Sequence, residues 1–318
     1  MEGYIKGTTK ETADKIMKEV KKIIVDQDEA IKNCLISLFC EGNVLLEGVP
    51  GLAKTLLVKT LSQSVDLEFK RIQFTPDLMP SDVTGTKIFN METREFQLKK
   101  GPIFTNFLLA DEINRTPPKT QAGLLEAMEE KFVTIDGERL ELPKPYMVFA
   151  TQNPIEYEGT YVLPEALTDR FLMKIKISYP SKEAEKNILM KHNLNMMDID
   201  KNVSAVCSKE HILKCREEIE NVIVKEELID YIVEVVSRTR ENELIEIGSS
   251  PRGAIALLKT AKAHAAMEGR DYVIPEDIKE VIIPTLTHRI ILKAEMEIEG
   301  VLVENVIMNI LDVVKVPR

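Results

Sequence analysis

The sequence predicts an α/β fold, in which helices cover a parallel β-sheet, followed by a smaller helical domain. Three observations favour it. Short apolar runs recur through the first half of the 318 residues, each bounded by polar residues, Gly or Pro, which is typical of strands buried on both faces. Helical patterns lie between these runs, so strands and helices alternate. From about Pro180 only helical patterns follow, so we expect one domain over residues 1–179 and a second over 180–318, each with its own core.

Five strands are expected in the first domain, over the apolar runs 44–46, 69–74, 107–110, 146–150 and 171–177. A helical pattern follows the first run over 54–65, and another follows the third over 116–131. Two hairpins interrupt this alternation, over 86–98 and 131–143. In the second hairpin, Asp136-Gly137 separates two alternating segments, and this pair favours a two-residue turn because both residues accept positive φ.

The second domain is expected to be all-helical. Helical patterns cover 181–193, 208–222, 225–242, 250–269 and 274–290. Within the third of these, Leu228, Ile232 and Val235 recur at the spacing of one helix face, which predicts core packing. The tail from Ala294 alternates at first and then becomes helical.

The composition argues against some classes of function. With 42 Lys and Arg against 52 Asp and Glu, the formal net charge is −10, so the chain lacks the excess of cations that a general nucleic-acid binder uses. The four cysteines do not have the spacing of a zinc site, and we expect reduced thiols. The segment 1–24 carries charge throughout, and no run of 18 apolar residues follows, so we expect a cytoplasmic protein without membrane insertion.

The segment GVPGLAKT, residues 48–55, lies between the first expected strand and the helix after it. It fits the phosphate-loop spacing G-x-x-x-x-G-K-[ST], except that Ala53 replaces the second glycine and is expected to restrict the backbone to conformations that a Cβ tolerates. Backbone N–H groups at a helix N-terminus bind phosphate oxygens, Lys54 adds a positive charge, and the Thr55 hydroxyl can join a magnesium shell. A tight turn into an amphipathic helix is the alternative. The expected nucleotide contacts here are Gly48, Val49, Pro50, Gly51, Leu52, Ala53, Lys54, Thr55 and Leu56.

Two carboxylates, Asp111 and Glu112, end the third expected strand in NFLLADEINR. They are expected at the sheet edge where α/β folds bind ligands. Asp111 is then the candidate for orienting magnesium together with Thr55, and Glu112 is the candidate base for an attacking water. The alternative is that the pair only caps the next helix.

These residues carry a family resemblance. The segments GVPGLAKT, LLADEINRTPPKTQAGLLEAMEE, ATQNP, LTDRF and SPRG follow in the order and approximate spacing of the MoxR family of AAA+ ATPases, and the likeness covers nearly the whole chain. The resemblance implies an αβα P-loop AAA+ nucleotide-binding domain with a five-stranded parallel sheet, a C-terminal all-helical lid domain and usually a hexameric ring. It also implies that both hairpins project from the ring face and engage substrate.

Further site residues are implied by this resemblance. Asn153, after the fourth strand, resembles sensor 1, which would hold the attacking water or the γ-phosphate. Arg170, before the fifth strand, resembles the arginine finger that a neighbouring subunit presents to the γ-phosphate; a surface pair with Asp169 is the alternative. Arg115 could be a second contact from a neighbour or a hydrogen-bond donor at a helix start.

Arg252 resembles sensor 2 of the lid, and it also has an independent signal. Ser250 is a good N-cap and Pro251 suits the first helical position, so Arg252 falls in the first turn, where the helix dipole disfavours a cation. A nucleotide phosphate would offset this cost, and a nearby Glu is the competing explanation.

The segment IIVDQDEAI resembles the stretch that contacts adenine in the family, with Asp26 in place of a glycine. Val25 and Gln27 are the expected base contacts, and the loop can survive because Asp tolerates left-handed backbone better than most residues.

The implied function is magnesium-dependent ATP hydrolysis coupled to remodelling or maturation of a protein complex, with ATP and Mg²⁺ as ligands. The implied partners are other copies of the chain, a protein client and a von Willebrand A-type protein. Two alternatives stay open: a magnesium-chelatase-type motor subunit, which shares both hairpins, and a nucleotide-gated scaffold without turnover. A nucleic-acid motor is disfavoured because the hairpin tips GERLE and NMETRE have no excess of basic residues.

Overall fold

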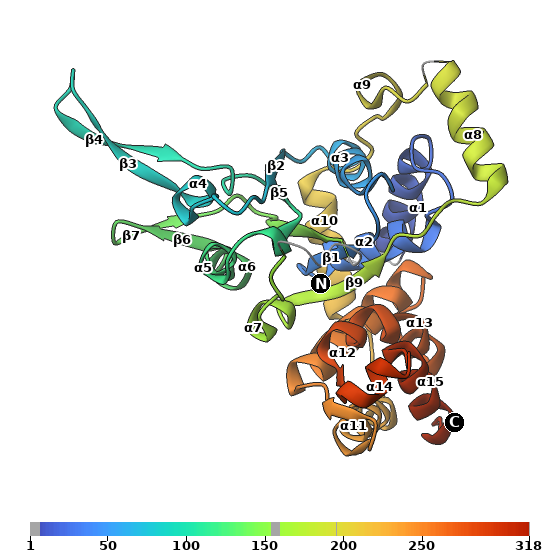
Figure 1. Cartoon of the computed structure of the whole chain (residues 1–318). Coiled ribbons are helices and arrows are strands. Elements are labelled where there is room, and N and C mark those ends of the chain that lie inside the picture. Colours follow the sequence, from blue (N-terminus) through green and yellow to red (C-terminus); the bar gives the residue numbers. More distant parts are fainter. Residues whose placement is uncertain (1–6, 154–159, 195, 318) are drawn as a thin grey trace.

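The computed structural model describes residues 7–153, 160–194 and 196–317. A five-stranded sheet lies at its centre in the order β2-β5-β8-β1-β9, and every neighbouring pair is parallel (Figure 1). All five expected strands are confirmed, with small shifts at their ends. They are β1 (Asn43–Glu47), β2 (Phe69–Gln73), β5 (Phe107–Asp111), β8 (Met147–Gln152) and β9 (Phe171–Lys176).

The two faces of the sheet pack into two cores, because successive residues of a strand point to opposite sides. In β1, Val44 and Leu46 belong to one core and Leu45 belongs to the other. The first core includes the helices α1 (Thr8–Val20), α2 (Asp28–Phe39) and α3 (Lys54–Ser64). The second core includes buried residues of the segment that follows β5, so the sheet is covered on both faces.

The helix expected over 116–131 forms two short helices instead, α5 (Pro118–Ala122) and α6 (Leu125–Glu130), after the 3₁₀ turn η1 (Ile113–Arg115). Between α5 and α6, Gly123 N–H donates to the Thr120 carbonyl and Leu124 N–H to the Gln121 carbonyl, both at 3.1 Å. These bonds span three residues rather than four, so the segment tightens into a 3₁₀ turn there.

Both expected hairpins are present. β3 (Gly85–Asn90) pairs with β4 (Glu95–Lys100), and β6 (Phe132–Ile135) pairs with β7 (Glu138–Glu141). Asp136 and Gly137 have φ angles of 49° and 79°, as the two-residue turn requires. Figure 1 shows the β3-β4 hairpin, which follows α4 (Pro80–Thr84), extending far from the sheet.

The region after β9 is mainly helical. In Figure 1 its last helices lie together beside the sheet, and they are α11 (Glu226–Glu241), α12 (Pro251–Met267), α13 (Pro275–Leu286), α14 (Ala294–Ile298) and α15 (Val303–Val313). The helix α13 packs on β9, and α12 packs on α1 and α2. Two corrections to the expected all-helical domain with its own core follow. A short antiparallel pair joins β10 (Ile245–Ile247) to β11 (Ile291–Leu292), and the buried side chains of this region form one cluster with those of α1, α2 and α3. The division between residues 179 and 180 stays a prediction.

The remaining elements are α7 (Glu165–Thr168), α8 (Lys182–Asn193), α9 (Ile199–Asn202), α10 (Lys209–Glu220) and η2 (Thr287–Arg289). Across the described ranges, no helix combines the length and the apolar character needed to cross a membrane.

Candidate functional site

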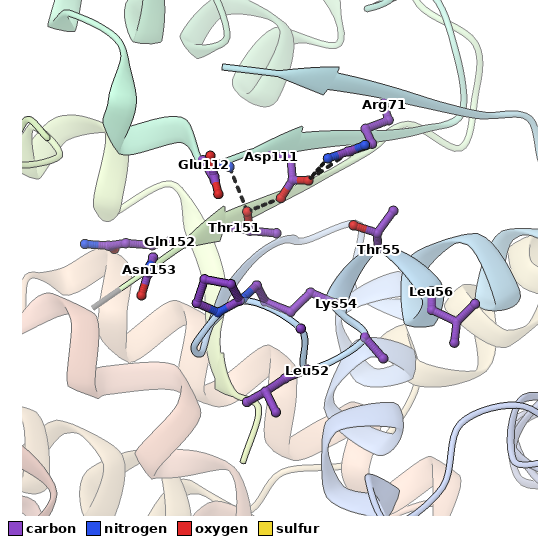
Figure 2. A pocket seen from close by; sticks show the side chains of 13 residues that line it. Leu52, Lys54, Thr55, Leu56, Arg71, Asp111, Glu112, Thr151, Gln152 and Asn153 are labelled. Atoms are coloured by element: carbon purple, nitrogen blue, oxygen red, sulfur yellow. Dashed lines mark hydrogen bonds and ion pairs between the residues drawn. The ribbon is translucent and has the colours of Figure 1, made fainter. Parts of the chain in front are cut away.

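The expected phosphate loop lies where β1 ends and α3 begins, and it borders a cavity of about 380 Å³ (Figure 2). The fold brings Arg71 of β2 and residues at the ends of β5 and β8 to this cavity. The described residues that line it are Pro50, Gly51, Leu52, Ala53, Lys54, Thr55, Leu56, Arg71, Asp111, Glu112, Thr151, Gln152 and Asn153. The loop, both carboxylates and Asn153, which are far apart in the sequence, therefore meet at one place.

The loop backbone has two positions that favour glycine. A Cβ on Gly48 would lie 2.7 Å from the carbonyl oxygen of Ile177, so the chain has no room for a side chain there. Gly51 has a φ of 87°, in the left-handed region. Ala53 also adopts this region, with φ 58° and ψ 24°, which costs a residue with a Cβ about 1–2 kcal/mol. Ala53 was expected to restrict the backbone to conformations that a Cβ tolerates, and its left-handed backbone shows that it does not.

Lys54 begins α3 and folds back onto the loop. Its Nζ donates to the carbonyl oxygens of Gly48 at 2.6 Å and Val49 at 2.9 Å. Burial lowers the pKa of Lys54, and the carboxylates of Asp111 and Glu112 act in the opposite direction. A lysine charge at this loop, within electrostatic reach of two carboxylates, suits a site for a phosphate chain with a bound cation.

Asp111 is fixed from two sides at the end of β5. Its Oδ1 accepts a hydrogen bond from Thr151 Oγ1 at 2.5 Å, and its Oδ2 accepts one from Arg71 Nε at 2.9 Å and lies 2.6 Å from Arg71 Nη2 (Figure 2). Asp111 is 8% exposed, so this carboxylate is almost completely enclosed by its partners. The Arg71 guanidinium supplies the positive charge that a buried carboxylate needs.

Glu112 has a left-handed backbone, with φ 56° and ψ 49°. Its N–H donates to Thr151 Oγ1 at 2.7 Å, and its Oε2 accepts from Gln73 Nε2 at 2.8 Å and pairs with Arg115 Nε at 2.9 Å. Glu112 precedes η1 but its side chain makes no capping hydrogen bond to that turn. The alternative that the pair serves only as a helix cap is thus not supported for Glu112, and Arg115 contacts a site residue of its own chain.

The donors around Thr55 fit a magnesium ion that is held partly by phosphate. The Thr55 hydroxyl and the Asp111 carboxylate line the same cavity, and Mg²⁺ commonly takes one or two protein oxygens together with phosphate oxygens and water. Among the described residues, no group of three or more His, Cys, Asp or Glu side chains could hold a metal by itself. Asn153, which is 6% exposed, directly follows β8 and lines the same cavity (Figure 2).

A second, mostly apolar cavity of about 160 Å³ adjoins the first, and both are lined by Gly51, Leu52, Ala53 and Leu56. Val25 and Gln27 line the second cavity, and their contact with a base stays a prediction. The amide of Gln27 donates to the Ser178 carbonyl at 2.9 Å, which anchors its side chain.

Asp26, between these two residues, has the left-handed φ of 59° that its replacement of a glycine predicts. Its Oδ2 accepts a hydrogen bond from Ser181 N–H at 2.7 Å, and this bond lowers the pKa of Asp26. The carboxylate therefore ties the loop to the segment before α8.

Arg170 and Arg252 lie together elsewhere, in a third cavity of about 320 Å³ that Glu129 and Asp169 also line. Neither Arg170 nor Arg252 is among the described residues that line the cavity at Lys54, so one copy of the chain does not bring Arg252 to its own phosphate loop. The cause is the packing of α12 and α13, which places the start of α12 near α6 and α7.

The alternatives for these arginines are resolved in part. Arg170 pairs with Glu129 and not with Asp169, which pairs with Arg289 at 3.0 Å. Arg252 lies 3.2 Å from Glu129, so a nearby Glu does offset its position in the first turn of α12. Ser250 accepts from Arg252 N–H at 3.2 Å, as the expected N-cap.

Several residues around these cavities were not identified from the sequence. Thr151 and Gln152 lie within the motif ATQNP, but only Asn153 was singled out there. Arg71 and Gln73 are two residues apart on β2, so they share one face of the sheet, and that alternation is the signal that could have found them. The segment 154–159, which includes the proline of ATQNP, lies outside the described residues.

The comparisons with known proteins agree with this geometry. Residues 43–173 match the ATPase family associated with various cellular activities (AAA), and residues 237–309 match the AAA lid domain. The chain is 46% identical over 307 residues to the uncharacterized protein YeaC of Bacillus subtilis, across 95% of this chain and 94% of YeaC. It is 43% identical over 316 residues to the chaperone MoxR1 of Mycobacterium tuberculosis, across 96% of this chain and 83% of that protein.

A crystal structure from Cytophaga hutchinsonii, described as a "putative ATPase", has a TM-score of 0.89 and 46% sequence identity to this chain, and the match covers 98% of this chain and 96% of that one. The AAA domain, the lid domain and these relatives together show that the chain belongs to the MoxR family of AAA+ ATPases.

Proposed function

We propose that the protein hydrolyses ATP with Mg²⁺ at the junctions between copies of the chain, and that it uses this reaction to remodel a protein client. The observation that carries the proposal is the separation of two sets of charges. Lys54, Asp111 and Glu112 line one cavity, and Arg170 and Arg252 line another. The first set would bind the phosphates and the magnesium ion and activate the attacking water, and the second would stabilise charge on the γ-phosphate. A second copy that brings its arginine cavity to the loop of the first would therefore complete the site.

In the proposed reaction, the loop amides and Lys54 bind the phosphates, and the apolar cavity at Val25 and Gln27 takes the base. Asn153 orients the attacking water, and Glu112 accepts a proton from it as its oxygen bonds to the γ-phosphorus and the bond to the β–γ bridging oxygen breaks. Mg²⁺ held by Thr55 and Asp111 would neutralise charge on the β and γ oxygens. Because Gln73 and Arg115 both contact Oε2 of Glu112, its Oε1 can accept a hydrogen bond from the attacking water while these contacts hold the side chain.

Arg170 and Arg252 are proposed to act on the γ-phosphate of the neighbouring copy, where guanidinium groups stabilise charge on the equatorial oxygens. The family resemblance implies action on a neighbouring copy for Arg170, and this proposal extends that action to Arg252. The proposed assembly is a ring of six copies in the cytoplasm, in which residues 1–179 bind nucleotide and residues 180–318 move as the lid.

The β3-β4 hairpin supports contact with a protein client. Its Phe89 and Phe96 rings meet edge to face at 5.3 Å, yet both side chains are exposed, and Met91 near the tip is 85% exposed. Exposed apolar side chains gathered on a projecting element favour binding to another protein. We propose that the client is a protein complex under maturation, with a von Willebrand A-type protein as a further partner.

The first test compares three variants by nucleotide binding and by phosphate release. Lys54→Ala is expected to lose binding. Glu112→Gln is expected to bind ATP without turnover, and Arg170→Ala to bind ATP with turnover reduced about a thousandfold. Lys59→Ala, an exposed lysine on the same helix as Lys54, is the matched control and is expected to behave as the parent.

The second test mixes Lys54→Ala chains with Arg170→Ala chains, which are each inactive alone. Turnover is expected to return, because some junctions then pair an intact loop from one variant with an intact arginine from the other. A mixture that stays inactive would contradict action between copies, and parental turnover in Glu112→Gln would remove the assigned base. A parent chain that binds ATP and never releases phosphate would favour the scaffold, and insertion of magnesium into a porphyrin with added partner subunits would favour the chelatase-type motor.

A further inference from the structure

A series of ion pairs links the two arginines of the third cavity. Glu129 pairs through Oε2 with Arg170, and its Oε1 lies 3.2 Å from Arg252 Nη2. Arg252 Nη1 lies 3.5 Å from Asp169 Oδ2, and Asp169 Oδ1 accepts from Arg289 Nε at 3.0 Å. A single carboxylate, that of Glu129, therefore contacts both guanidinium groups that the proposed function directs to a neighbouring copy.

Arg170 and Arg289 are also fixed by backbone carbonyls. Arg170 donates to the carbonyl oxygens of Ala166 at 3.1 Å and Leu125 at 3.2 Å. Arg289 donates to the carbonyl oxygen of Phe171 at 2.8 Å, and its side chain is 3% exposed. These contacts would remain if a carboxylate of the network were removed, so neither arginine depends on Glu129 alone for its position.

Arg252 is held differently. Its guanidinium contacts two carboxylates, those of Glu129 and Asp169, and its side chain is 46% exposed. It lies in the first turn of α12, where the helix dipole disfavours a positive charge. Glu129 and Asp169 lie in the AAA domain and Arg252 lies in the lid domain, so these contacts also fix the start of α12 against the sheet domain.

The charge of Glu129 also helps to hold Arg252 beside Arg170. Arg170 and Arg252 carry like charges in one cavity, and they would repel each other without the carboxylate between them. Glu129 offers one oxygen to each, so its charge and its two-oxygen geometry both contribute. A neutral amide of the same shape could keep only part of this arrangement.

We propose that Glu129 is a positioning residue, which holds Arg252 of the lid beside Arg170 of the AAA domain so that both guanidinium groups reach the same γ-phosphate of a neighbouring copy. This inference rests on the proposed function and adds a residue to it. Glu129 itself contacts no phosphate, and it acts through Arg252.

The first experiment measures steady-state ATP turnover of Glu129→Gln, with Glu130→Gln as the matched control because Glu130 is the next residue of α6 and is exposed. We expect kcat to fall about tenfold in Glu129→Gln, with KM for ATP changed less than about twofold, because the loop that binds ATP is untouched. Glu130→Gln is expected to match the parent. Parental kcat in Glu129→Gln would overturn the inference, and so would a higher kcat, which would mean that Glu129 competes with the phosphate for the arginines.

The second experiment separates a positioning role from a folding defect. In a background that already carries Arg252→Gln, adding Glu129→Gln is expected to lower kcat less than about twofold further, because the residue through which Glu129 acts is gone. Equal tenfold losses with and without Arg252 would show that Glu129 acts in another way. Glu129→Asp, which keeps the charge on a shorter side chain, is expected to restore part of the turnover.

The third experiment distinguishes failure of this inference from failure of the proposed function. Glu129→Gln chains are mixed with Lys54→Ala chains, which have intact arginines, and turnover is expected to rise toward that of the Arg170→Ala and Lys54→Ala mixture. If the Arg170→Ala mixture recovers and the Glu129→Gln mixture does not, action between copies stands and the role of Glu129 is wrong. If neither mixture recovers turnover, the proposed action between copies and the role of Glu129 are both wrong.

Discussion

The charged side chains around the phosphate loop each contact another group of the protein. Lys54 donates to two loop carbonyls, the Asp111 carboxylate pairs with Arg71, and Glu112 accepts from Gln73. Thr151 differs, because its hydroxyl joins the Asp111 side chain to the Glu112 backbone. The carboxylates are thus fixed relative to each other by Thr151, while their remaining partners can be exchanged.

Ala53 is the residue whose conformation most clearly contradicts its side chain. Replacing it with glycine removes a Cβ from the left-handed region, and this stabilises the folded state by about 1–2 kcal/mol. Glycine also raises the entropy of the unfolded chain, and this offsets about 0.4–1 kcal/mol of the gain. We therefore expect Ala53→Gly to increase the free energy of unfolding by about 0.5 kcal/mol in urea titrations.

Ala254→Gly is the control for this prediction, because Ala254 lies within α12 and has no positive φ. It is expected to lower the free energy of unfolding by about 1 kcal/mol, as glycine does in a helix. A loss of similar size in Ala53→Gly would contradict the strain assigned to the loop.

The helices α12 and α13 are joined by a buried carboxylate at the start of α13. Asp277 is 0% exposed, pairs with Arg270 at 2.5 Å and His264 Nδ1 at 2.6 Å, and accepts from Ile274 N–H at 2.8 Å. Burial alone would raise its pKa, but these hydrogen bonds outweigh burial and lower the pKa of Asp277 to about 2. One side chain thus caps α13 and binds it to α12 and to the Arg270 turn.

This pairing predicts how stability depends on pH. Because the pKa of Asp277 is lowered from 3.8 in the unfolded chain to about 2, its stabilising effect is complete above about pH 5 and is lost as the pH falls toward 2. At pH 7, Asp277→Asn is expected to lower the free energy of unfolding by about 3 kcal/mol. The difference between parent and variant is expected to shrink by about 1 kcal/mol at pH 3.

Urea titrations at pH 7, 5, 4 and 3 would measure this difference, with Asp230→Asn on the exposed face of α11 as the control. The control difference is expected to stay near zero. A difference between parent and Asp277→Asn that is the same at pH 7 and pH 3 would rule out Asp277 as the group responsible.

Four strands of the central sheet were predictable because they are almost fully buried and therefore appear as short apolar runs, as in β5, which is buried at every residue. In β2 only Ile72 is buried, so its apolar signal is weaker. The Asp136-Gly137 turn was predictable because its signal is local. The contacts of Arg71 and Gln73 were not, because they depend on β2 lying next to β5 in a register that sets Gln73 opposite Asp111. Strand order and register are set by packing between segments distant in the sequence, and no local pattern records them.

For the same reason, the position of Arg252 relative to the phosphate loop was not predictable from the sequence. Its place at the start of a helix was predictable from Ser250 and Pro251, but its distance from the phosphate loop depends on how the lid helices pack against β9 and α2. That packing turns Arg252 toward Arg170 and Glu129. The chain as a whole therefore presents a loop with carboxylates at one cavity and paired arginines at another.

This division of charges predicts that turnover per chain depends on protein concentration. In dilute solution, single chains have Lys54 and Glu112 at one cavity while Arg170 and Arg252 line another, so they are expected to hydrolyse ATP slowly. As the concentration rises and copies associate, turnover per chain is expected to increase and reach a plateau, at the concentrations where light scattering detects the assembly. Arg170→Ala is the control, since its turnover should stay low throughout even though it assembles. If the parent hydrolyses ATP at its full rate under conditions where scattering detects only single chains, hydrolysis does not require the arginine cavity of a second copy. A single chain would then contain every group that the reaction requires.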